Sequence, residues 1–215
     1  MLTLLEEVVL LTIDPRTGCL HGDQQFSVPY ALAGAALFDL ALAGRVDTDV
    51  DSIQVIDSTP TGNALQDELL AELAGGGAAM TVRGWVEQTF RTRKDLEDRA
   101  LAQLVDHGLI RLEKTRRLWV IEVQRFPLVD GKPLQLAKER LAQAILDDTI
   151  PPTRDIMLVS LTASCGLLNH VLTRDQQDAR AERIETLSTV ETISRNVSSA
   201  IGALYEDMAR GLSGV

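Results

Sequence analysis

The sequence predicts a mainly α-helical fold, a single compact domain over residues 1–215 with one short β-hairpin. Apolar residues recur at helical spacing in most segments that lie between Pro- and Gly-containing stretches. Residues 109–123 instead alternate apolar and polar side chains, which is typical of strands. The composition, with 45% hydrophobic and 24% charged residues, is that of a globular protein.

The N-terminal part predicts two helices separated by a long loop. Over residues 2–11, Thr3 and Glu6 have the spacing of a capping box. Residues 14–29 are rich in Pro, Gly and Asp and predict a loop, and loops of this length are often functional. A helix follows over residues 30–43, with Pro29 at its first turn. Its single charge makes it the expected centre of the fold.

The next segments predict one strand and two helices. Residues 45–60 are polar apart from a strand-like run at 53–56. Asn63 can cap a helix that ends near residue 73, and a short helix with Trp85 spans residues 81–90. The three glycines at 75–77 predict a flexible joint, although the flanking segments are too short to form separate domains.

Residues 91–129 combine an amphipathic helix with the hairpin. The apolar face of the helix consists of Leu96, Ala100, Leu101, Leu104 and Val105. We expect a first strand from about residue 109 and a second strand up to residue 123. The expected polar tip is formed by Lys114, Thr115 and Arg116. Because a hairpin of this size is unstable alone, it either packs on the helix or presents its tip to a partner.

Beyond Pro127 the sequence returns to helical patterns. We predict four helices, over residues 133–147, 154–172, 175–187 and 188–212.

The charge distribution points to an anionic partner for the hairpin. The chain has a formal net charge of −10, which disfavours nucleic-acid binding by the whole protein. Residues 83–125 carry ten Lys or Arg against seven carboxylates, so this segment is +3 and the remainder is −13. A solvated face of mixed charge is the alternative explanation.

The sequence predicts a cytoplasmic protein that can be peripheral on the inner face of a membrane. It has no apolar run near the ~18 residues of a membrane span and no secretory signal. Cys19 and Cys165 lie far apart and are expected as free thiols. The abundance of Arg over Lys, together with many Ala and Leu residues, is typical of a GC-rich bacterial genome.

No residue pattern predicts an enzyme, a metal site or a cofactor. The three histidines lack ligand spacing such as HExxH, and neither cysteine belongs to a CxxC pair. Ser160 and Ser164 do not match the GxSxG nucleophile motif. The glycines at 75–77 lack the Lys of a phosphate-binding loop.

Five blocks of sequence resemble the Golgi phosphoprotein 3 family in the same order. They are LTLLEEVVLL at the start, LFDLALAGRV at 37–46, STPTGNALQDELL at 58–70, QLVDHGLI at 103–110 and the hairpin that leads to FPL at 126–128. The resemblance implies a helical domain with a β-hairpin and a non-enzymatic peripheral adaptor or scaffold. Eukaryotic members bind phosphatidylinositol 4-phosphate, use the hairpin for membrane contact and oligomerisation, and retain glycosyltransferase tails as cargo.

The family's headgroup site is largely not retained in this sequence. The family has a Trp in the region of Asp23 and Gln24, and Arg residues at the positions of Ala33, Lys94 and Glu97. A phosphomonoester favours the paired donors of Arg. We therefore expect specific phosphatidylinositol 4-phosphate binding to be lost or much weakened.

The hairpin tip and the start of the preceding helix supply the candidate membrane-binding or anionic-lipid-binding residues. These residues are Arg116, Arg117, Leu118, Trp119, Arg91, Arg93 and Lys94. A Trp beside Arg suits the headgroup region of an anionic leaflet, where each basic residue contributes about 1 kcal/mol. A homo-oligomer through the hairpin would add avidity. Alternatively, Trp119 packs inward and the arginines are only solvated.

Two other functions stay open at this point. A helix followed by a hairpin is also the outline of a winged-helix nucleic-acid-binding regulator, with Arg93, Lys94 and Arg99 on its recognition helix. The loop at 14–29 could instead bind a small ligand. Its candidate residues are Asp14, Arg16, His21 and Asp23.

Overall fold

The computed structural model describes residues 1–22, 27–49, 52–76, 80–117 and 121–212. In these ranges the helices are α1 (Leu4–Leu11), α2 (Val28–Leu42), α3 (Ala64–Gly75), α4 (Val82–Thr92), α5 (Leu96–Asp106), α6 (Lys132–Leu146), α7 (Thr153–Ser164), α8 (Arg174–Ala179), α9 (Ala181–Val190), α10 (Thr192–Leu212) and the 3₁₀ helix η2 (Leu167–His170). The strands form two antiparallel pairs, β1 (Val46–Thr48) with β2 (Ile53–Val55) and β3 (Glu113–Arg117) with β4 (Ile121–Arg125). The fold is mainly helical, which confirms the predicted class.

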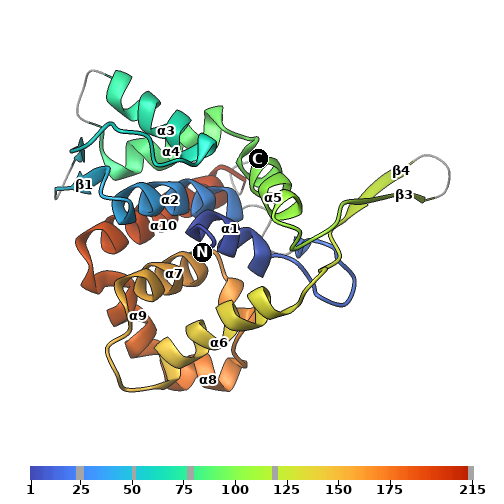
Figure 1. The fold of residues 1–215 in the computed structure, drawn as a ribbon. Helices are drawn as coiled ribbons and strands as arrows, with labels where there is room; N and C mark the ends of the chain where they lie inside the picture. Colours follow the sequence, from blue (N-terminus) through green and yellow to red (C-terminus); the bar gives the residue numbers. More distant parts are fainter. Residues whose placement is uncertain (23–26, 50–51, 77–79, 118–120, 213–215) are drawn as a thin grey trace.

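Helix α2 lies at the centre of the helical body, as its sequence predicted. Helices α1, α3, α4, α5, α7 and α10 all contact it (Figure 1). The close packing depends on small residues. A Cβ atom at Gly34 would lie 2.6 Å from Cγ1 of Val197 in α10 and 3.1 Å from Cδ2 of Leu161 in α7. A side chain at this position would therefore force the three helices apart.

The single charge of α2, Asp39, caps α1 across the core. Its carboxylate accepts hydrogen bonds from the backbone N–H groups of Leu4 at 2.7 Å and Leu5 at 3.1 Å. The first amides of a helix have no acceptor within the helix, so the side chain of Asp39 satisfies two of them. Burial raises the pKa of Asp39 to about 7, although the two hydrogen bonds favour its charged form.

Several predicted helix starts are confirmed. Thr3 and Glu6 form the capping box of α1, Asn63 accepts hydrogen bonds from the first turn of α3, and Pro29 lies in the first turn of α2. Trp85 of α4 is buried, and its indole N–H donates to the carbonyl oxygen of Ala33 at 3.0 Å. This tryptophan belongs to the core.

The helices of the C-terminal half are divided differently from the prediction. The single helix expected over 154–172 ends at Ser164, because Gly166 has a φ of +76°, a conformation that a helix cannot contain. The helix expected over 175–187 is two helices, α8 and α9, which separate at Arg180 with a φ of −116°. Strand β1 was not predicted, since three mostly polar residues carry little periodic signal.

The second hairpin spans residues 113–125 instead of about 109–123, and its predicted polar tip is wrong. Lys114, Thr115 and Arg116 belong to β3, where they pair with Gln124, Val123 and Glu122, and Arg117 pairs with Ile121. Below the strands, the buried Ile110 forms a β-bridge with Leu128. The pairing register of β3 and β4 is therefore set at the base of the hairpin, where Ile110 is buried in the core. Polar residues near the tip do not set it.

The two cysteines are free thiols, as predicted. Burial raises the pKa of Cys165 to about 12, which keeps this thiol protonated near neutral pH. None of the helices in the described ranges has both the length and the apolar character needed to span a membrane.

Candidate membrane-contacting site

The β3–β4 hairpin projects away from the helical body (Figure 1). Over residues 113–125 the cations are Lys114, Arg116, Arg117 and Arg125, and the carboxylates are Glu113 and Glu122. The hairpin thus has a formal charge of +2 in a chain of −10. A basic projection on an acidic body is the part of the molecule that an anionic surface attracts first.

Two of the candidate membrane-binding residues, Arg116 and Arg117, lie at the outer end of β3. Arg116 and Arg117 are the last two residues of β3, and Ile121 opposite Arg117 is the first residue of β4. Leu118 and Trp119 lie outside the described residues, so their place at a membrane interface stays a prediction.

The base of the hairpin is bound to the turn that follows α1. The backbone N–H of Phe126 donates to the carbonyl oxygen of Gly18 at 2.6 Å. Gly18 has a φ of +68°, and a Cβ atom there would lie 2.8 Å from the nitrogen of Pro127. Only glycine satisfies both the conformation and the contact. The turn therefore holds the strand that leaves the hairpin.

Two of the candidate ligand residues of the 14–29 loop, Asp14 and His21, contact different groups. Oδ1 of Asp14 accepts the backbone N–H groups of Arg16 at 2.8 Å and Thr17 at 3.3 Å, which lower the pKa of Asp14. The ring of His21 stacks on His170 of η2, with 3.6 Å between the ring centroids. Asp14 and His21 thus have different partners, and Asp23 lies outside the described residues.

Arg91 and Lys94 are exposed near the junction of α4 and α5. Arg91 lies in the last turn of α4, and its Nη2 is 2.6 Å from Oε1 of Glu87 one turn earlier. The Arg91 side chain is 71% exposed, so this pair is open to solvent and is weak. Both residues remain accessible to an anionic ligand.

Arg93, by contrast, is held by the acids of α3. Its Nη2 lies 3.2 Å from Oε2 of Glu68 and 3.0 Å from Oε1 of Glu72, and its side chain is only 16% exposed. Arg99 also binds Glu68, at 2.6 Å and 2.9 Å. The two guanidinium groups lower the pKa of Glu68 to about 2. This pairing argues against contact of Arg93 and Arg99 with phosphates, as a winged helix would require.

The positions that the family resemblance assigns to a lipid-headgroup site carry few cations in the part of the chain that the structure describes. Ala33 is fully buried, and its carbonyl oxygen is taken by Trp85. Burial and the nearby charge of Asp98 raise the pKa of Glu97. Lys94 is the one cation among the described positions of this set, while Asp23 and Gln24 lie outside them.

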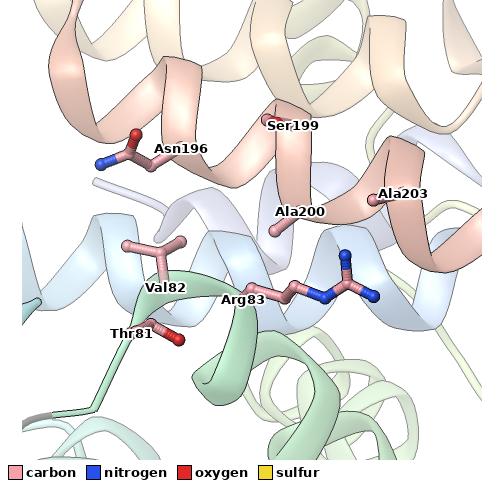
Figure 2. A pocket seen from close by; sticks show the side chains of 7 residues that line it. All are labelled: Thr81, Val82, Arg83, Asn196, Ser199, Ala200 and Ala203. Atoms are coloured by element: carbon pink, nitrogen blue, oxygen red, sulfur yellow. The ribbon is translucent and has the colours of Figure 1, made fainter. Parts of the chain in front are cut away.

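A groove of about 320 Å³ lies between the start of α4 and α10. Its lining residues are Thr81, Val82, Arg83, Asn196, Ser199, Ala200 and Ala203. Figure 2 shows the side chain of Arg83 extended along α10 past Ala200 toward Ala203. Nη2 of Arg83 lies 2.7 Å from Oδ2 of Asp207, so the charge of this arginine is balanced within the protein. Arg83 of this groove is therefore not a further candidate for contact with an anionic surface.

Comparison with known proteins identifies the family of this chain. The model of the Golgi phosphoprotein 3 (GPP34) family matches residues 4–204. This chain belongs to the Golgi phosphoprotein 3 family. Vacuolar protein sorting-associated protein 74 of Eremothecium gossypii is 27% identical over 224 aligned residues, which cover 85% of this chain and 67% of that protein. The family resemblance of the sequence is thereby confirmed, and the hairpin lies within the matched region.

Sequence reasoning missed two residues that position the hairpin or pair with the candidate arginines, namely Gly18 and Glu68. Glu68 lies in an ordinary charged helical segment, and nothing local to α3 indicates that it binds Arg93 and Arg99. The role of Gly18 could have been predicted from sequence, because this glycine ends a turn that starts with Asp14 and Pro15. A glycine at the end of such a turn often has a positive φ.

Proposed function

We propose that this Golgi phosphoprotein 3 family member is a non-enzymatic peripheral adaptor that contacts an anionic membrane surface through its β3–β4 hairpin. The observation that carries the proposal is the projecting hairpin with a formal charge of +2 on a chain of −10 (Figure 1). Basic residues near an anionic leaflet contribute about 1 kcal/mol each. The acidic body is repelled by the same surface, which favours an orientation with the hairpin toward the lipid.

The sequence of the connection supports this orientation. Leu118, Trp119 and Val120 stand between the paired residues Arg117 and Ile121. Tryptophan favours the interface between headgroups and acyl chains, and adjacent arginines can bind lipid phosphates. A single hairpin with a few charges binds weakly, so we propose that attachment is strengthened by an oligomer that presents several hairpins.

We propose that the contact depends on surface charge without strong preference for phosphatidylinositol 4-phosphate. Arg93 is engaged by Glu68 and Glu72, and Glu97 stands where the family has an arginine. A phosphomonoester needs several charge-assisted donors at one point. Among the described positions that the resemblance assigns to the headgroup site, Ala33, Lys94 and Glu97, only Lys94 is a cation.

The adaptor role includes a protein partner. The name of the relative from Eremothecium gossypii associates that protein with vacuolar protein sorting, and the family resemblance implies protein cargo. An adaptor binds membrane and cargo together without chemistry of its own. The acidic body, away from the basic hairpin, is the surface that remains available for such a partner.

Sedimentation with liposomes tests this proposal. Wild-type protein is compared with an Arg116→Glu/Arg117→Glu/Trp119→Ala variant on phosphatidylcholine vesicles, on vesicles with added phosphatidylserine, and on vesicles with added phosphatidylinositol 4-phosphate. The matched control is Arg174→Glu/Arg195→Glu, which reverses two exposed charges on α8 and α10. Circular dichroism confirms that each variant is folded.

We expect wild type and control to sediment with both kinds of anionic vesicle of equal charge and to detach at high salt. The hairpin variant should stay in solution. Equal binding by the hairpin variant and the control would overturn the role of the hairpin. A lack of binding to any vesicle by wild type would overturn the membrane-adaptor function itself.

A further inference from the structure

Glu6 of α1 is a buried carboxylate whose two oxygens have different surroundings. Its side chain is 1% exposed. Oε2 accepts the backbone N–H of Thr3 at 2.7 Å and the hydroxyl of Thr3 at 3.1 Å. Oε1 accepts no hydrogen bond in the part of the chain that the structure describes, but Nδ1 of His107 lies 3.1 Å from it. A buried acceptor without a partner is unfavourable, so the contact with His107 decides how well Glu6 is compensated.

We propose that His107 and Glu6 form a pH-responsive clasp, which holds the base of the β3–β4 hairpin more firmly as the pH falls from about 8 to about 6. A protonated imidazole pairs with the carboxylate of Glu6, whereas a neutral one leaves the buried oxygen without a counter-charge. His107 also follows the last residue of α5, where the carbonyl groups of the helix end favour a positive charge. Its side chain is 54% exposed, so it exchanges protons with solvent directly.

The arginines that approach α1 compensate other carboxylates. Arg140 of α6 lies 2.8 Å from Oε1 of Glu7 and 3.4 Å from Oδ1 of Asp155. Arg154 of α7 lies 3.1 Å from Oε2 of Glu7. Adjacent residues of a helix point to different sides, so these pairs are separate from Glu6. Within the described residues, the imidazole at the end of α5 is therefore the ion-pair partner of Glu6.

The charged group of α2 acts in the same direction as His107. Burial raises the pKa of Asp39 to about 7, and the charge of Glu6 adds to this shift. As the pH rises, Asp39 gains a negative charge while His107 loses its positive charge. Both changes leave more uncompensated negative charge around Glu6. The clasp is thus expected to weaken over a narrow range near neutral pH.

The clasp lies two residues before the backbone ladder that leads into the hairpin. The N–H of Leu109 donates to the carbonyl oxygen of Leu104 in α5 at 3.0 Å, and its own carbonyl oxygen accepts the N–H of Val129 at 2.9 Å. The other strand is held by Gly18 in the turn that follows α1. Both strands of the hairpin are therefore tied to α1, one of them through His107.

The role of the clasp in regulation rests on the proposed function. An anionic leaflet attracts protons as it attracts other cations, so the pH at its surface is lower than in bulk solution. A chain that approaches such a surface would have its His107 protonated more fully there. The clasp would then fix the hairpin at the surface that the hairpin contacts.

Three variants of the full chain separate the charge of His107 from other effects. His107→Gln has no charge at this position at any pH, and His107→Lys keeps a positive charge at both pH 6 and pH 8. Glu6→Gln removes the carboxylate but retains the capping box, which accepts Glu or Gln. The matched control is Asp106→Asn, which changes an exposed carboxylate next to His107. Circular dichroism confirms that each variant is folded.

Amide hydrogen exchange, followed by NMR at pH 6 and pH 8, measures the clasp. The rates of Leu109 and Val129 are divided by their intrinsic rates and compared with that of Ile184 in α9, whose N–H is bound to the carbonyl oxygen of Arg180. We expect the protection of both amides in wild type to be about threefold higher at pH 6 than at pH 8. Asp106→Asn should behave like wild type.

The other variants should not show this rise. Protection should stay low at both pH values in His107→Gln and Glu6→Gln, and high at both in His107→Lys. An equal rise in wild type and His107→Gln would overturn the clasp, as would a wild type without any rise. Loss of the rise in Asp106→Asn would assign it to the general charge at the end of α5 and would also overturn the proposal. Asp39 is present in every variant, so its titration cancels in the comparison.

Vesicle binding distinguishes this inference from the proposed function. The ratio of binding to anionic vesicles at pH 6 and pH 8 should be about twofold larger for wild type than for His107→Lys. Equal ratios would overturn regulation by the clasp. A wild type that binds no vesicle at either pH would overturn the proposed function, whereas the exchange measurement needs no lipid and still decides whether the clasp exists.

Discussion

Substitution of Gly18 by alanine should loosen the base of the hairpin. Gly18 accepts a hydrogen bond from the backbone N–H of Phe126 and has a φ of +68°. In the variant, the new Cβ atom would meet the nitrogen of Pro127 at 2.8 Å, its Cα at 3.1 Å and the carbonyl carbon of Phe126 at 3.2 Å. These are backbone atoms, so no side-chain rotation can relieve the contact. The turn must move away from the strand.

The expected loss of stability has two parts. Left-handed backbone costs alanine about 1 kcal/mol relative to glycine. An additional methyl group in a tight contact costs about 1–3 kcal/mol. Together they lower the free energy of unfolding by about 2–4 kcal/mol. Gly44→Ala measures the cost of the left-handed backbone alone. Gly44 has a φ of +67°, and a Cβ atom added there would have no atom within 4 Å.

Urea unfolding of the two variants and wild type measures this difference. We expect Gly18→Ala to lose at least about 1 kcal/mol more than Gly44→Ala. It should also bind anionic vesicles less well than Gly44→Ala at temperatures where both are folded, since the Phe126 hydrogen bond that anchors the hairpin is lost. Equal stability and equal vesicle binding of the two variants would refute the inference that the turn holds the hairpin.

Two further variants test the electrostatic reasoning. Glu68→Gln/Glu72→Gln should release Arg93 and Arg99 from the acids of α3 and increase binding to anionic vesicles by about two- to fivefold; unchanged or weaker sedimentation would show that these arginines are not masked. Asp39→Asn tests a pH dependence. The pKa of Asp39 is about 7 in the folded state against an ordinary 3.8, so the folded protein keeps a proton that the unfolded chain releases. Stability should therefore fall as pH rises through this window, by about 2–3 kcal/mol between pH 5 and pH 8 in urea unfolding. This fall should be much smaller in Asp39→Asn, and an identical fall would assign it to other groups.

The sequence by itself determined the helical class, the central helix and the start of several helices. These features are local. A capping box needs Thr3 and Glu6 three residues apart, and a buried central helix needs only a run of apolar residues such as that of α2. The order of the five sequence blocks also led to the correct family, which the match over residues 4–204 confirmed. The basic character of the hairpin follows from composition alone.

Only the tertiary structure decided which charges are free and where the hairpin begins. Glu7 is bound by Arg140 at 2.8 Å and Arg154 at 3.1 Å, more than a hundred residues away in the chain. Likewise, Glu68 holds Arg93 from another helix. Such pairs leave no periodic trace, because a charged side chain looks the same in sequence whether it is solvated or paired. The hairpin register depends in the same way on contacts of Ile110 and Gly18 with Leu128 and Phe126, which exist only once the helical body has placed these segments side by side.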